Sequence, residues 1–180
     1  MQVIADAHSR ACKPTQVNND AFLVDPDLRL FVVADGLRGR HGAAPAARAA
    51  IEAVRAEVAR RQDTVRSFDN SSAAQFELIR LVEDAVSSAC RAVYQLSGSS
   101  PEYAGAAATM TLLLVTGGKA VMGHVGVCRL YLYRDGQVHQ LSEDHTYVRE
   151  LVWRGIDAPH GVRLWQVGGA DAITGEADGR

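Results

Sequence analysis

The residues best suited to chemistry lie at the end of an apolar run, Leu30–Ala34, which leads directly into Asp35 and Gly36. A carboxylate at a strand end, followed by glycine, can hold a hard divalent cation, because such ions prefer oxygen ligands. Three side chains that suit an anion follow at once: Arg38, Arg40 and His41. The stretch therefore allows three interpretations: a metal site, an anion-binding site, or a simple turn.

Composition limits the class of protein. The 180 residues are 47% hydrophobic and 22% charged, which fits one globular domain with a sizeable core. The net charge of −2 gives no overall field that would attract nucleic acid or an anionic membrane. Cys12, Cys90 and Cys128 are odd in number and far apart, which favours a reducing compartment over a disulfide scaffold or structural zinc. We see no signal peptide and no apolar run long enough to span a membrane, so we expect a soluble cytoplasmic protein.

The periodicity of apolar residues predicts the elements that must position these side chains. Residues 21–24 and 30–34 flank Asp25-Pro26-Asp27, residue types that favour a tight turn, so an antiparallel hairpin is expected. Helical spacing begins at Pro45 and returns in a second stripe from Ile79 to Val93. Further strands are expected at Met1–Ala7, Thr109–Thr116, Ala120–Val125, Arg129–Arg134, Val138–Leu141 and Arg163–Val167, and a short helix at Asp144–Arg154.

Strands, two helices and strands again predict an α+β fold of antiparallel sheets, with the helices covering one sheet face. The sequence contains no internal repeat and no clear domain boundary. We expect a single domain over residues 1–168, followed by a flexible tail over residues 169–180.

Five separated segments carry a resemblance to a known family: Asn18–Phe22, Phe31–Gly36, Gly105–Thr109, His124–Arg129 and Leu141–His145. In order and spacing they resemble motifs of the metal-dependent protein phosphatases, the PPM or type 2C Ser/Thr phosphatases, over about residues 18–155. The resemblance implies a PPM-type sandwich of antiparallel sheets flanked by helices, of which the C-terminal part is missing here. It also implies the family's chemistry, in which two Mg²⁺ or Mn²⁺ ions activate a bridging water or hydroxide that attacks the phosphorus of a phosphoserine.

Carried onto matching positions, the resemblance assigns Asp35, the carbonyl of Gly36, and Asp20 as metal ligands. Other family positions have changed. Asn19 stands where the family has Glu, and Val127 stands where it has a metal-binding aspartate. Thr15 replaces the arginine that binds substrate phosphate, with Lys13 nearby in a different register. His41, a weak candidate for a general acid, comes one place later than the family's histidine.

The family pattern continues with a Ser-Asp-Gly segment and a final Asn-x-x-Asp, each supplying a metal-binding aspartate, whereas this sequence stops at Arg180. With so few carboxylates, we expect Mg²⁺ or Mn²⁺ to be weakly held or absent. The candidates for binding phosphate or another anion are Arg38, Arg40 and Lys13. We also expect Asp35 to pair with one of the two arginines, or with a single ion.

Two functions from different classes remain open. The first is a pseudophosphatase, a regulatory module that binds a phosphoprotein or a regulatory protein without turnover. The second is an active Mn²⁺- or Mg²⁺-dependent phosphoserine and phosphothreonine phosphatase with a reduced metal site. The incomplete sandwich also predicts an exposed sheet edge, which a partner, self-association or a rearranged tail would cover. Neither nucleic acid nor a membrane is an expected partner.

Overall fold

The computed structural model describes residues 2–11, 13, 17–37, 41–145, 161–166 and 172–176. Its helices are α1 (Ala43–Arg60), α2 (Gln62–Arg66) and α3 (Ser72–Ser99), with a 3₁₀ turn η1 at Pro101–Tyr103. Its strands are β1 (Asp20–Asp25), β2 (Leu30–Leu37), β3 (Ala107–Thr116), β4 (Lys119–Val125), β5 (Arg129–Arg134), β6 (Gln137–Gln140), β7 (Gly161–Gln166) and β8 (Ala172–Glu176).

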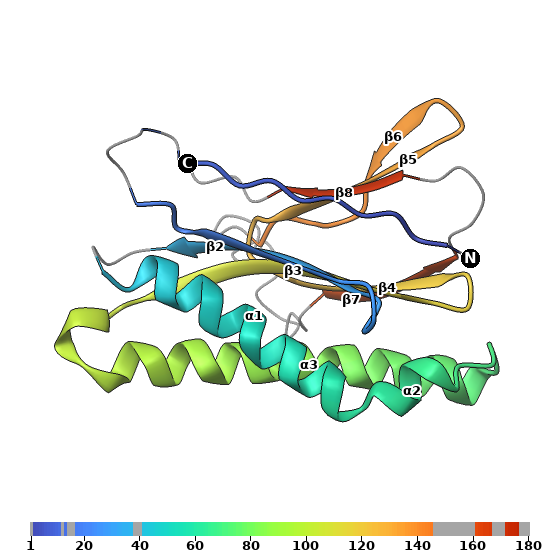
Figure 1. The fold of residues 1–180 in the computed structure, drawn as a ribbon, viewed down its shortest axis with the longest axis horizontal. Helices are drawn as coiled ribbons and strands as arrows, with labels where there is room; N and C mark the ends of the chain where they lie inside the picture. Colours follow the sequence, from blue (N-terminus) through green and yellow to red (C-terminus); the bar gives the residue numbers. More distant parts are fainter. Residues whose placement is uncertain are drawn as a thin grey trace, which may run out of the picture.

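The strands form two antiparallel sheets. The main sheet has the order β1-β2-β3-β4-β7, and the small sheet has the order β6-β5-β8. Helices α1 and α3 cover one face of the main sheet, and the small sheet lies over the other face (Figure 1). The result is the expected α+β sandwich with its long helices on one side.

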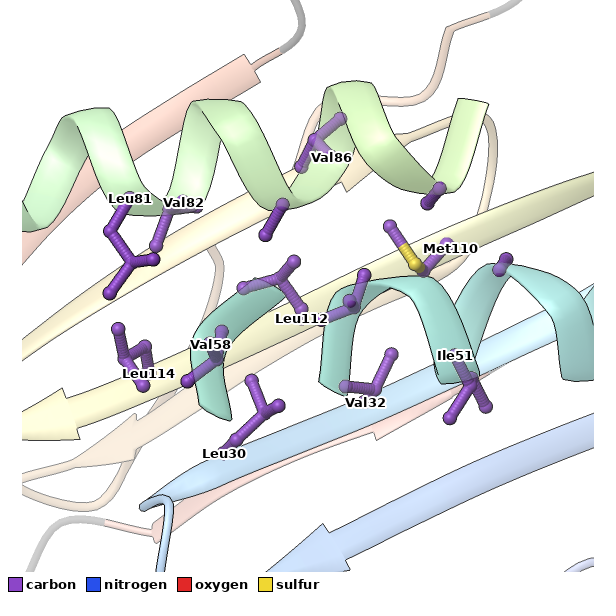
Figure 2. Packing of buried hydrophobic residues seen from close by; sticks show 14 of the residues in the cluster. Leu30, Val32, Ile51, Val58, Leu81, Val82, Val86, Met110, Leu112 and Leu114 are labelled. Carbon is purple, nitrogen blue, oxygen red and sulfur yellow. The ribbon is translucent and has the colours of Figure 1, made fainter. Parts of the chain in front are cut away.

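The larger core fills the space between the main sheet and the helices (Figure 2). Alternate residues of β2 and β3, such as Leu30, Leu112 and Leu114, are fully buried against α1 and α3. Each such leucine contributes about 1.5–3 kcal/mol by leaving water. Helix α3 begins where the Ser71 hydroxyl accepts a hydrogen bond from the Ala74 N–H at 3.2 Å.

The face of the main sheet that looks toward the small sheet is apolar at one end and polar at the other. A smaller apolar cluster, made of Leu113, Val115, Ala120, Met122 and Leu130, packs between the two sheets. Because side chains alternate along a strand, the residues of β3 that continue this face toward its start are Thr111 and Thr109. Both threonines are buried. The space between the sheets therefore changes from apolar to polar toward the end where β2 reaches Asp35.

The structure confirms the hairpin of β1 and β2 and both long helices, and α1 begins two residues before Pro45. The expected strand at Met1–Ala7 is wrong, because residues 2–11 are in no strand and Ile4 is 90% exposed. The short helix α2 was not expected. Most of the helix expected at Asp144–Arg154 lies outside the described residues. None of the helices in the described ranges combines the length and apolarity needed to cross a bilayer.

The C-terminal segment departs from the expected flexible tail. Residues Ala172–Glu176 form β8, which pairs antiparallel with β5 through Tyr131↔Thr174 and its neighbours. Backbone hydrogen bonding to an open strand explains this order, because the β5 edge would otherwise present unpaired N–H and C=O groups. The rearranged tail predicted to cover a sheet edge therefore has a counterpart in β8. A domain boundary at residue 168 stays a prediction.

Candidate functional site

Two carboxylates define the site. In the antiparallel pairing of β1 with β2, Asp20 stands directly opposite Asp35. Side chains opposite each other lie on the same face, with Cβ atoms about 4.5–5.5 Å apart. Asp35 is only 4% exposed, while Asp20 is partly buried. Like charges held opposite one another are unfavourable by themselves, so this arrangement favours a cation between or beside the two carboxylates.

Strand β3 adds a third side chain beside the two carboxylates. Asp35 pairs with Thr109 of β3, so Asp20, Asp35 and Thr109 lie side by side on the face that looks toward the small sheet. The backbone also connects β1 to the site, because Gly36 N–H donates to the Asn19 carbonyl at 3.1 Å. The local geometry is therefore fixed by strand register, which positions side chains more accurately than a loop does.

Gly36 is required by the approach of helix α1. A Cβ atom at this position would lie 1.9 Å from the Ala43 carbonyl oxygen, which is a backbone atom. The first residue of α1 therefore packs directly on the strand end that carries Asp35. Only glycine, which has no Cβ atom, leaves room for this contact. The packing of α1 therefore explains the glycine after Asp35 without reference to a metal.

Cys128 occupies the space beside the two carboxylates. Its Sγ atom lies 2.9 Å from the Thr109 hydroxyl, and its residue is fully buried. Burial raises the pKa of the thiol to about 11, and the negative charges of Asp35 and Asp20 act in the same direction. The Thr109 hydroxyl and the Asp35 backbone N–H oppose that rise in pKa. Cys128 is therefore a neutral packed thiol and no nucleophile at neutral pH.

Behind Cys128, a hydrogen-bonded network joins β3, β4 and the segment after β6. Thr111 Oγ1 contacts both the Cys128 carbonyl and His124 Nδ1, and His124 Nε2 contacts the Glu143 carbonyl. Gly126 N–H donates to His145 Nδ1 at 3.2 Å. Sequence reasoning missed this network, because its members are 13–19 residues apart and meet only through strand register.

Asp144 forms an ion pair with Arg129 at the start of β5. Arg129 donates to both of its carboxylate oxygens, from Nε at 3.0 Å and from a terminal nitrogen at 2.7 Å. This two-point pair fixes the segment after β6 to the start of β5. Together with the His145 contacts, it holds the connection between β4 and β5, residues 126–128, next to Asp35.

The structure describes only some of the residues that were predicted to bind an anion. Arg38 and Arg40 lie outside the described residues, so their pairing with Asp35 stays a prediction. Lys13 is exposed in the segment before β1. His41 is 61% exposed at its side chain, and its Nδ1 lies 4.0 Å from a carboxylate oxygen of Glu102 in η1. The histidine therefore faces η1, which does not favour a role as general acid at Asp35.

The described donor set fits one divalent ion better than two. Asp20 and Asp35 supply two anionic ligands, and the backbone beside Gly36 offers carbonyl oxygens. Asn19 adds no charge, and the side chain of Val127, in the connection beside Cys128, has no atom that can bind a metal. Across the described residues, no group of three or more His, Cys, Asp or Glu side chains is arranged to hold a metal ion. A pair of ions would leave much of its mutual repulsion uncompensated by these residues.

Comparison with known proteins gives a consistent result. The family model described as "Protein phosphatase 2C" matches residues 9–173. The chain is 30% identical over 131 residues to the serine/threonine protein phosphatase PstP of Mycobacterium tuberculosis, which covers 73% of this chain and 23% of PstP. It is 34% identical over 67 residues to the protein phosphatase PhpP of Streptococcus pneumoniae, covering 37% of this chain and 27% of PhpP. The chain thus spans about a quarter of the length of these relatives.

Solved structures show the same fold. The catalytic domain of PstP, in complex with two manganese ions, superposes with a TM-score of 0.66 at 22% identity, covering 92% of this chain and 72% of that chain. A serine/threonine phosphatase of S. agalactiae superposes with a TM-score of 0.67 at 18% identity, covering 92% and 75%. At these identities the likeness establishes the fold and leaves the chemistry to the residues of the site.

Proposed function

The chain belongs to the protein phosphatase 2C family, and we propose that it acts as a pseudophosphatase, a domain that binds a phosphorylated protein without efficient turnover. The observation that carries the proposal is the ligand set at the end of β2. Asp20 and Asp35 stand opposite each other, but the flanking positions where the family has acidic residues hold Asn19 and Val127. The site thus retains the centre of a metal-binding arrangement and lacks part of its periphery.

The chemistry of the missing charges supports impaired catalysis. Two divalent cations placed close together repel each other strongly, and anionic ligands must offset that repulsion. An amide at position 19 offers one neutral oxygen, and a valine at position 127 offers none. Metal activation of a water needs a firmly held ion, because the ion must lower the pKa of that water and stabilise charge on the phosphoryl group. A weakly held single ion supplies less of both effects.

The same site remains suited to binding. A single Mn²⁺ or Mg²⁺ ion at Asp20 and Asp35, or the guanidinium groups of Arg38 and Arg40, would attract a phosphate group. Lys13 is a third cationic candidate. The relatives are described as serine/threonine protein phosphatases, which makes a phosphoserine or phosphothreonine protein the favoured partner class. We place this activity in the cytoplasm, in keeping with three dispersed cysteines and the reducing compartment that they favour.

A second function deserves its own test because the carboxylate pair is retained. An active phosphatase would use Asp20, Asp35 and further ligands from outside the described residues, with Mn²⁺ or Mg²⁺ as cofactor. The two functions share the same fold and differ in whether the phosphoryl group of the bound protein is hydrolysed.

Fluorescence anisotropy with a labelled phosphoserine peptide tests the binding half of the proposal. The expected result is saturable binding that the unphosphorylated peptide does not reproduce. Substituting both arginines, Arg38→Ala with Arg40→Ala, should weaken binding about tenfold or more, because a charge-assisted hydrogen bond contributes about 1.5–3 kcal/mol. Arg80→Ala, on the exposed side of α3, is the matched control and should change nothing. Equal affinity for both peptides would refute phosphoprotein binding.

A further inference from the structure

The hydrogen bonds around His124 depend on the number of protons on its ring. Thr111 Oγ1 lies 2.5 Å from the Cys128 carbonyl oxygen and 2.8 Å from His124 Nδ1. A carbonyl can only accept, so the single hydroxyl hydrogen of Thr111 points to Cys128. His124 Nδ1 must then donate to the Thr111 oxygen. On the other side of the ring, Nε2 lies 3.0 Å from the Glu143 carbonyl, which again can only accept. The full set of contacts is therefore complete only when both nitrogens carry hydrogen, that is, when the ring is an imidazolium.

A neutral ring cannot satisfy the same contacts. With hydrogen on Nε2 alone, Nδ1 would take the Thr111 hydrogen, and the Thr111 oxygen would face the Cys128 carbonyl with no hydrogen between them. With hydrogen on Nδ1 alone, the lone pair of Nε2 would face the Glu143 carbonyl. Either neutral form releases one of the two contacts. His124 is 1% exposed, so water does not easily replace the lost partner.

The neighbouring His145 has the opposite requirement. Its Nδ1 accepts a hydrogen bond from Gly126 N–H at 3.2 Å, a contact that requires this nitrogen to carry no hydrogen. Its own backbone N–H donates to the Gly126 carbonyl at 2.8 Å. The two imidazole rings lie edge to face, with centroids 4.8 Å apart. Two positive charges at that separation would repel each other, which favours one proton for the pair.

We propose that His124 and His145 form a histidine latch, in which a single proton on His124 ties the segment Glu143–His145 to the connection of residues 126–128. When the proton leaves, His124 must release either Glu143 or the Thr111–Cys128 contact, and the latch opens. When a second proton reaches His145, the acceptor for Gly126 N–H is lost and the latch opens on that side. The latch is therefore complete only over an intermediate range of pH.

The charges facing the latch set that range. Burial lowers the pKa of His124 below its ordinary value of 6.5, and a positive charge on His145 would lower it further. The carbonyls of Glu143 and Gly126 and the carboxylate of Asp144 act in the opposite direction, and Asp144 is itself paired with Arg129 of β5. On the far side of β4, the residue opposite His124 is Gly161 of β7, which has no ionisable side chain. From β3 the facing group is the neutral hydroxyl of Thr111. Because the pKa of His124 is lowered, the latch closes below the ordinary titration point of histidine.

Cys128 contacts both the latch and the candidate site. The carbonyl of Cys128 belongs to the latch, while its thiol lies against Thr109 in the row that contains Asp35. Gly126 supplies the sharp turn of this connection, with φ of +95° and Thr109 too close for any Cβ atom. Proton uptake at His124 thus adjusts the backbone beside the two carboxylates. This inference does not depend on the proposed binding function.

Ring-nitrogen NMR of the ¹⁵N-labelled protein, from about pH 8 to about pH 5, tests the latch directly, since histidine titrates in this range. We expect His124 to take up the first proton, so that both of its nitrogens show the shift of N–H. His145 Nδ1 should keep the shift of an unprotonated nitrogen over the same interval. Amide hydrogen exchange at residues 143–145 should slow about two- to tenfold as His124 titrates, the effect of one added hydrogen bond.

Variants separate the latch from general effects of pH. His124→Gln should abolish the pH dependence of exchange at residues 143–145, whereas His139→Gln, an exposed histidine on β6, should leave it intact. The titration of the unmodified protein decides the matter even if His124→Gln fails to fold. The proposal would be overturned if His145 took up the first proton, or if the His124 ring stayed neutral down to about pH 5. It would also be overturned if amide exchange at residues 143–145 did not change as His124 titrates.

Discussion

Asp20 and Asp35 face each other across the β1–β2 pair, and Asp35 is buried while Asp20 remains partly open to solvent. This register places two negative charges on one face at the strand end where helix α1 begins. Two divalent cations held close together need more anionic ligands than this pair supplies. The relationship explains why we expect the chain to bind a divalent cation weakly, if it binds one.

Removing one charge from this pair should stabilise the metal-free protein. Asp20→Asn relieves like-charge repulsion between directly opposed side chains and should raise the free energy of unfolding by about 0.2–1 kcal/mol in chelator-treated samples. Denaturant melts measure this change. Asp27→Asn, in the exposed turn between β1 and β2, is the control and should not stabilise the protein. A destabilised Asp20→Asn protein without metal would show that the two carboxylates do not repel each other.

Restoring a charge beside the pair should strengthen cation binding. Asn19→Glu returns the residue type that the family has at this position, and the affinity for Mn²⁺ measured by calorimetry should rise about tenfold or more, because oxygen-ligand sites are tuned by charge count. Gln137→Glu adds the same charge on exposed β6 and should leave the affinity unchanged. Equal gains in both variants would assign the effect to net charge and contradict a site at Asp20 and Asp35.

The close contact between Gly36 and α1 predicts a large effect from one methyl group. Gly36→Ala would force the Ala43 carbonyl away from the strand and should cost about 3 kcal/mol or more, beyond the usual range for overpacking because the obstacle is backbone. Gly98→Ala meets no atom within 4 Å on α3, and should stabilise the protein by about 0.5–1 kcal/mol. Thermal melts of the two variants should therefore shift in opposite directions.

The Cys128 thiol should be inert in the folded protein. Its pKa is raised from 9.0 to about 11, so its thiolate fraction at neutral pH is about 100-fold smaller than that of an ordinary thiol. Labelling with iodoacetamide should accelerate as the pH rises toward 11, and peptide mapping should find half-buried Cys90 modified before Cys128. In denaturant the two cysteines should react alike. Rapid labelling of Cys128 in the native state at pH 7 would contradict its buried position beside Asp35.

Much of the fold is predictable from sequence because its elements carry strong periodic patterns. The hairpin of β1 and β2 follows from apolar runs flanking Asp25-Pro26-Asp27, and both long helices follow from their apolar stripes. The strand β8 was missed because Ala172–Glu176 is short, contains a glycine, and gains its order by pairing with β5. The failed strand at Met1–Ala7 shows the converse, since an apolar residue such as Ile4 is exposed where no strand edge pairs with it.

The site was predictable only where a motif marked it. Asp35 and Gly36 were marked by their place at the end of an apolar strand, the resemblance added Asp20, and strand register brings the two aspartates together. The latch around His124 was missed because its partners come from β3, the β4–β5 connection and the segment after β6. No local pattern announces such contacts, since they depend on which strands become neighbours. A buried histidine on an alternating strand was the one available signal, and by itself it names no partner.

Phosphate release tests the central claim most directly. The purified protein is incubated with a phosphoserine peptide and saturating Mn²⁺, alongside Asp35→Asn and the PstP catalytic domain as a positive control. We predict that release by this protein does not exceed release by Asp35→Asn, although the peptide binds. Turnover that requires Mn²⁺ and disappears in Asp35→Asn would contradict the pseudophosphatase and establish a working phosphatase.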